Sequence, residues 1–208
     1  MVKKIIQEFL DKELGKLIKN DYIYNEFSLQ HELGIYLRKK LKKQGKYKVQ
    51  FERNVDDVFG SLSSEKKEMD IYIENMNDAK ERYAIELKFP RNGQYPEQMY
   101  SFVKDIKFME DVKNIGKATK TFVVTLVDDE KFYSNNSGKR PLVVSGIYQY
   151  FREVPGRLLP YITGTIRKPT GSKGIPSVLI RGSYRIVWKP VIIPKKPKND
   201  FKYYFHEI

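Results

Sequence analysis

The residues TKTFVVTLVD, at positions 119 to 128, constrain the fold more than any other stretch of this sequence. They form an apolar run that is rich in β-branched side chains. Such a run is typical of a strand that is buried within a sheet. The run therefore predicts the centre of a β-sheet.

Apolar side chains recur with helical spacing in three other segments. They predict an amphipathic helix over residues 3–19, a second helix over about 25–43, and a third from residue 96 to about 113. Gly45 should end the second helix, because glycine commonly follows the last helical turn.

Two further segments alternate between apolar and polar residues, which is typical of strands. Residues 46–55 predict one strand, and residues 68–90 predict two short strands joined by a polar turn. The order is then helix, three strands, helix, strand. We expect an α/β fold with a mixed central sheet flanked by helices.

The length of 208 residues favours one domain. The α-β-β-β-α-β core should span about residues 25–128, and a β-rich C-terminal extension should span about residues 129–208. Within this extension, residues 177–193 predict one or two strands, and residues 194–200 have the composition of a charged linker.

The charge points to a polyanionic partner. The chain contains 39 Lys and Arg against 26 Asp and Glu, which gives a formal net charge of +13. Basic side chains that face a phosphate backbone release condensed counterions, so nucleic acid is the expected partner. The alternative is that a lysine-rich composition serves solubility alone.

The absence of certain residues and motifs excludes other classes of function. The chain has no Cys and only two His, which excludes disulfides, thiolate nucleophiles and Cys-based zinc sites. It has no phosphate-binding glycine loop, dinucleotide fingerprint or nucleophile elbow. No apolar stretch is long enough to cross a bilayer, and the N-terminal residues are too charged for a signal peptide. We expect a cytoplasmic protein that has no membrane partner.

Three charged residues of the hairpin should share one face. If its strands pair symmetrically about residues 77–79, Asp70 lies opposite Glu86, and Lys88 follows on the same face. Directly opposed side chains have Cβ atoms about 4.5–5.5 Å apart, so both carboxylates could hold one cation. The other face, which should be the core face, carries five apolar residues: Ile71, Ile73, Tyr83, Ile85 and Leu87. The alternative is that solvent separates the two carboxylates, as on any half-exposed hairpin.

Met69-Asp70 and Glu86-Leu87-Lys88, set in this order of elements, resemble the PD-(D/E)xK nuclease superfamily, which includes many restriction endonucleases. The resemblance covers about residues 25–128. Met69 stands where the family motif has proline. The resemblance implies a restriction-endonuclease-like core and a Mg²⁺-dependent DNA endonuclease that hydrolyses phosphodiester bonds, as a restriction or defence enzyme.

The resemblance also implies the roles of individual residues. Asp70 and Glu86 would bind Mg²⁺, for which Mn²⁺ could substitute, and Lys88 would position or deprotonate the attacking water. A helix-borne acid often completes the metal site in this family. Glu32 is the first candidate for that acid and Glu26 is the second.

Candidate contacts to DNA lie close to the motif in sequence. Arg91, Lys104 and Lys107 could bind phosphates, while Gln94 and Gln98 could orient phosphate or water. The alternative role of the three basic side chains is that of solvated charges on a loop and a helix. RNA is the alternative substrate, and a homodimer or a partner subunit is expected if both strands are cut. A nucleic-acid-binding protein with this fold but without catalysis is the competing function.

Overall fold

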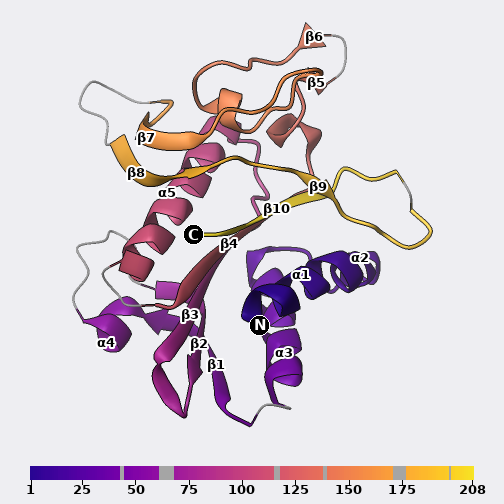
Figure 1. Ribbon diagram of the computed structural model, residues 1–208. Helices are drawn as coiled ribbons and strands as arrows, with labels where there is room; N and C mark the ends of the chain where they lie inside the picture. Colours follow the sequence, from indigo (N-terminus) through magenta and orange to yellow (C-terminus); the bar gives the residue numbers. More distant parts are fainter. Residues whose placement is uncertain (43–44, 61–67, 115–117, 138–139, 171–176, 197) are drawn as a thin grey trace.

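The computed structural model describes residues 1–42, 45–60, 68–114, 118–137, 140–170, 177–196 and 198–208 (Figure 1). At its centre lies a mixed six-stranded sheet with the strand order β1-β2-β3-β4-β10-β9. The strands are β1 (Tyr47–Asn54), β2 (Glu68–Asn75), β3 (Asp78–Lys88), β4 (Lys120–Val127), β9 (Lys189–Pro190) and β10 (Lys202–Glu207). Only β3 and β4 pair in parallel among these strands, because α5 carries the chain back between them. The predicted α/β class and mixed sheet are confirmed.

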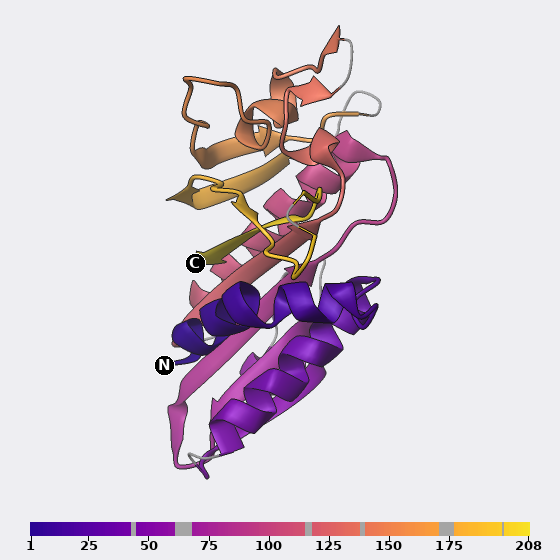
Figure 2. The same cartoon turned by 90° about the vertical axis from the view of Figure 1, so that its right-hand side faces the viewer.

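Helices cover both faces of the sheet. Helices α1 (Val2–Lys12), α2 (Leu14–Lys19) and α3 (Glu26–Lys42) lie together on one face, as Figure 2 shows. Helix α5 (Tyr95–Asn114) lies on the other face, against β3 and β4 (Figure 1). The second and third predicted helices are confirmed. The first is two helices that meet at Glu13, and a short helix α4 (Val55–Phe59) was not predicted.

The C-terminal segment completes the central sheet. Strand β10 pairs antiparallel with β4, and β9 pairs with β10 at the edge. Two further pairs lie outside this sheet: β5 (Asn136–Ser137) with β6 (Arg140–Pro141), and β7 (Ile162–Arg167) with β8 (Ser177–Tyr184). Short 3₁₀ helices η1 (Glu130–Phe132) and η2 (Gly146–Tyr150) precede β7. The expected strands within residues 177–193 are present, whereas β7 and β10 were missed.

The sheet separates two hydrophobic cores. One core lies between the sheet, α5 and the C-terminal segment, and includes Tyr72, Ala84, Phe102, Phe151 and Trp188. The other lies under α1 and α3, and includes Leu33, Leu37, Ile71, Ile85 and Phe122. Because both faces of β2 and β3 contact a core, the hairpin is buried on both sides.

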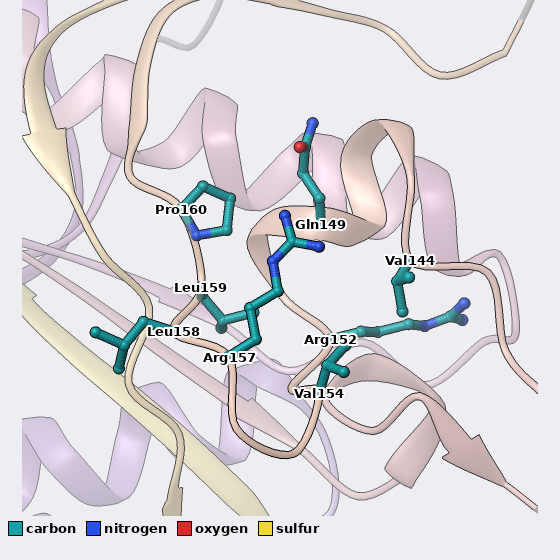
Figure 3. Close-up of a pocket in the computed structure, with 8 residues that line it drawn as sticks. All are labelled: Val144, Gln149, Arg152, Val154, Arg157, Leu158, Leu159 and Pro160. Atoms are coloured by element: carbon teal, nitrogen blue, oxygen red, sulfur yellow. The ribbon is translucent and has the colours of Figure 1, made fainter.

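The small cavity in Figure 3 is partly open to the surface, since Leu158 in its lining is exposed. It lies between η2 and residues 152–160, and its volume is ≈ 10 Å³. Such a volume holds about one water molecule, so it is too small for a ligand. Arg152 beside it is buried, and its guanidinium donates to the carbonyl oxygens of Lys131 (2.8 Å) and Val143 (2.7 Å). This arginine joins η1 to the segment that precedes η2.

Within the described part of the chain, no helix has both the length and the apolar character that a membrane span requires.

Candidate active site

The charged residues of the hairpin lie at one end of the central strands, where several elements begin or end. Strand β2 begins at this end of the sheet and β3 finishes there, because the two strands run antiparallel. Glu26, the first residue of α3, contacts the end of β3. Asp70, Glu86 and Lys88 therefore come to the same end of the sheet as the N-terminus of a long helix.

The predicted register of the hairpin is confirmed over most of its length. Tyr72 pairs with Ala84 and Glu74 pairs with Arg82, as the symmetric hairpin requires. The pair Ile71–Ile85 is the last of the regular pairs, and continuing its register by one residue brings Asp70 next to Glu86. At this position a side chain bridges the strands: Asp70 Oδ2 accepts a hydrogen bond from the backbone N–H of Leu87 at 2.7 Å. The carboxylate is thereby fixed beside β3.

The face of the hairpin that carries the two carboxylates is buried rather than half-exposed. Asp70 is 9% exposed and Glu86 is 1% exposed. The reason is that α5 and α4 add a second core on the face that the sequence pattern left open. Bulk solvent is therefore largely excluded from both carboxylates, and buried carboxylates need hydrogen bonds or positive charge around them.

Lys88 is held by an acid from a distant part of the chain. Its Nζ lies 3.1 Å from Glu26 Oε1, and Glu26 Oε2 accepts from the backbone N–H of Phe89 at 3.1 Å. The Lys88 side chain is 22% exposed, so its ammonium is partly shielded from water. Glu26 thus fixes the position of both the ammonium and the strand end.

Gln30 connects α3 to the opposite side of Asp70. Its Nε2 donates to the Asp70 carbonyl oxygen at 2.6 Å and also to Glu52 Oε1. The pairs on either side place Glu52 of β1 opposite Asp70. Glu52 has a φ of 47°, which is uncommon for a residue with a Cβ. Strained backbone of this kind occurs preferentially at functional sites.

The structure places Glu26 beside Lys88 and places Glu32 elsewhere. Residues of a helix are about 100° apart around its axis, so Glu26 and Gln30 share one face and Glu32 points about 160° away from Gln30. Glu32 lines a surface hollow whose wall Gln30 also reaches, but it does not contact Lys88. Among the described residues, no three Asp, Glu or His side chains lie close enough to hold one metal ion together.

Three of the predicted DNA contacts lie at the same end of the molecule as the hairpin acids. Arg91 forms an ion pair with Asp128 and stacks over the Phe89 ring at 4.9 Å. Gln98 Nε2 donates to Asn92 Oδ1 at 3.0 Å, and the backbone N–H of Gln94 donates to the same oxygen at 3.4 Å. Arg91 is therefore partly neutralised, and the two glutamines shape the loop before α5.

The two predicted lysine contacts lie further along α5. With a rise of 1.5 Å per residue, Lys104 and Lys107 lie about 13 Å and about 18 Å from the start of the helix. Lys107 forms an ion pair with Asp111 one turn later, while Lys104 is exposed. The structure does not bring these lysines to the end of the sheet where Asp70 lies.

Sequence reasoning missed Gln30 and Glu52. Two signals could have found them. Gln30 is four residues after Glu26, a spacing that places both on one face of a helix. Glu52 belongs to the strand before the hairpin, and a strand that pairs with β2 must place one residue opposite Asp70.

The donor set suits Mg²⁺. This ion prefers oxygen ligands and is commonly bound by one or two carboxylates, with water and substrate phosphates in the remaining positions. Asp70 and Glu86 supply two carboxylates from adjacent strands, and burial limits competing water. Two protein carboxylates are enough for such a site when a phosphate completes it.

Comparisons of this chain with models of protein families, with curated proteins and with solved structures found no match.

Proposed function

We propose that this protein is a Mg²⁺-dependent nuclease that hydrolyses phosphodiester bonds of DNA, built on a restriction-endonuclease-like core. The observation that carries the proposal is the burial of two carboxylates, Asp70 and Glu86, on adjacent strands at the end of the sheet where Lys88 also lies. The order of helices and strands around them supports it. The net charge of +13 supports a polyanionic substrate.

Asp70 and Glu86 would hold the metal ion. When bound, Mg²⁺ supplies a Lewis acid that makes water more acidic and neutralises charge on the phosphate. The hydrogen bond from the Leu87 N–H keeps Asp70 in one orientation. A fixed orientation lowers the entropy that the site loses when it binds its ligands.

Lys88 would stabilise negative charge at the phosphate or move a proton to or from the attacking water. Glu26 holds its ammonium at the end of β3. Because Glu26 also accepts from the Phe89 N–H, the ion pair and the strand end move together. Glu26 is therefore a positioning residue in this proposal.

The experiment is an assay of plasmid cleavage. Supercoiled DNA is incubated with the protein and Mg²⁺, or with EDTA, and with the variants Glu86→Gln and Glu74→Gln. Glu74 is the matched control, because it lies on the same hairpin and pairs with Lys48 at 3.5 Å. We expect cleavage by the wild type and the control, and a loss of at least about 100-fold in Glu86→Gln, comparable to removing one preorganised electrostatic group.

The second candidate is a nucleic-acid-binding protein without catalysis. It is favoured by the lack of a three-residue acidic cluster among the described residues. Plasmid that is retarded in a gel but remains uncut with Mg²⁺ and Mn²⁺ would support it. Cleavage that is as fast in Glu86→Gln as in the wild type would instead contradict the assigned site.

A further inference from the structure

The segment between α2 and α3 exposes an unusual group of aromatic side chains. Tyr22 and Tyr24 are each 58% exposed and Phe27 is 72% exposed, while Ile23 between the tyrosines is buried in the core under α3. The Ile23 side chain therefore points into the core, while those of Tyr22 and Tyr24 point to solvent. Three large aromatic rings within six residues are therefore presented to solvent on an anchored segment.

The backbone of this segment is held rigidly. Asn25 Oδ1 accepts from the Ser28 N–H at 2.8 Å, and Ser28 Oγ accepts from the N–H groups of Tyr24 and Asn25, each at 2.9 Å. This reciprocal arrangement caps the N-terminus of α3. The aromatic side chains consequently extend from a fixed helix start, which reduces the ordering needed when they bind a ligand.

The aromatic residues surround a hollow that adjoins the candidate active site. Its volume is ≈ 410 Å³, and its lining includes Tyr22, Tyr24, Phe27, Gln30 and His31, with one carboxylate, that of Glu32. The volume is in the range of pockets for small ligands. Gln30 links the hollow to the site, because its Nε2 donates to the Asp70 carbonyl oxygen.

A second, more basic pocket adjoins this hollow. Tyr24 lines both, and the second pocket, of ≈ 490 Å³, has four basic and two acidic side chains in its wall. The basic ones are Lys19, Arg91, Lys195 and Lys196. A basic groove that leads to exposed aromatic rings is the arrangement that binds a single strand: cations follow the phosphates and bases stack on the rings.

We propose that the aromatic hollow binds unpaired nucleobases, so that the substrate is nucleic acid with single-stranded nucleotides next to the scissile phosphate. This inference rests on the proposed nuclease function and specifies its substrate class. Bases of an intact duplex are stacked on one another and present only their edges, so they would not use these rings. Tyr24 and Phe27 are the expected stacking residues.

The test is a binding measurement without divalent metal, which separates it from catalysis. A fluorescein-labelled 16-nucleotide DNA strand of mixed sequence, and the duplex formed with its complement, are titrated in EDTA at fixed salt and followed by anisotropy. The proteins are the wild type, Tyr24→Ala, Phe27→Ala, Tyr24→Phe and Tyr161→Ala. Tyr161 is the matched control, since it is 47% exposed and lines neither pocket.

We expect Tyr24→Ala and Phe27→Ala each to weaken single-strand binding by about 5- to 150-fold, with a change of about twofold or less for the duplex. Tyr24→Phe and Tyr161→Ala should bind the single strand like the wild type. Because the changed side chains are exposed, thermal melting should show that all variants fold.

Single-strand affinity that is unchanged in both alanine variants would overturn the inference, and would assign the hollow to another class of partner, such as a protein. An equal loss for strand and duplex would also overturn it. Either result, together with plasmid cleavage that depends on Glu86, would leave the nuclease proposal standing. A wild type that binds neither DNA would also overturn the inference, and the plasmid assay with Mg²⁺ would then test the proposed function separately.

Discussion

At the scale of single residues, the position of one acid depends on helix geometry that a motif does not contain. Glu26 and Glu32 both lie on α3, yet only Glu26 contacts Lys88. The motif predicted Asp70, Glu86 and Lys88 at one end of the hairpin, and the structure places them there. The motif does not contain the information that separates Glu26 from Glu32, because that choice depends on the rotation of α3 relative to the sheet.

The cap of α3 provides a prediction at this scale. Asn25→Ala removes the acceptor for the Ser28 N–H, which then lacks its partner at the helix start. We expect a loss of about 1 kcal/mol in the free energy of unfolding, measured by urea denaturation. Asn25→Asp should keep the cap and nearly all of the stability. Equal stability of the alanine variant and the wild type would show that the cap contributes nothing.

At the scale of elements, the sequence patterns succeeded where a helix or strand has one clear periodicity. Helix α3, helix α5 and strand β4 lie within a few residues of their predicted ranges. The patterns failed for β7, which follows a segment with Gly and Pro, and for β10, which follows the segment predicted as a charged linker. Their partners are distant in sequence or separated by a long connection, and local periodicity does not contain that information.

The contact between α2 and the C-terminal segment also belongs to this scale. A Cβ at Gly15 would lie closer to the carbonyl oxygen of Ile192 than real Cβ atoms come. Backbone cannot move aside by changing a rotamer, so Gly15→Ala must separate α2 from this segment. We expect a destabilisation of about 1–3 kcal/mol in urea denaturation.

Gly93→Ala is the matched control for that substitution. The nearest atoms to a Cβ at Gly93 belong to the Tyr95 ring, 3.7 Å away, which is ordinary van der Waals contact. Its stability should stay within about 0.5 kcal/mol of the wild type. An equally small effect in both variants would mean that the C-terminal segment does not pack closely on α2.

At the scale of the whole molecule, burial on both faces of the sheet is the property that the sequence predicted least well. The alternation of the hairpin indicated one core, because a local pattern does not show which face of the sheet α5 and the C-terminal segment cover. With two cores, groups from the end of the chain become buried against the sheet. His206 of β10 is partly buried there, and its ring centre lies 6.2 Å from that of Tyr184 and 5.8 Å from that of Tyr204.

This histidine provides a prediction on pH. Burial lowers the pKa of His206 below its ordinary value, so the folded protein binds fewer protons than the unfolded chain. Its contribution to stability is therefore present above the ordinary histidine pKa of about 6.5 and is lost as the pH falls below it. We expect the melting temperature to fall less in His206→Phe than in the wild type between pH 8 and pH 5. An equal fall in melting temperature in the variant and the wild type would contradict this account.

The pairing of β4 with β10 also has a consequence for synthesis on the ribosome. Strand β4 emerges long before the strand that completes its outer edge, since residues 128–201 lie between them. Until β10 is made, the nascent chain carries an apolar strand with unpaired backbone groups along that edge. Such an edge readily pairs with other chains. Cells that make this protein quickly should therefore need chaperones that shield nascent chains, and production at low temperature should increase its soluble yield.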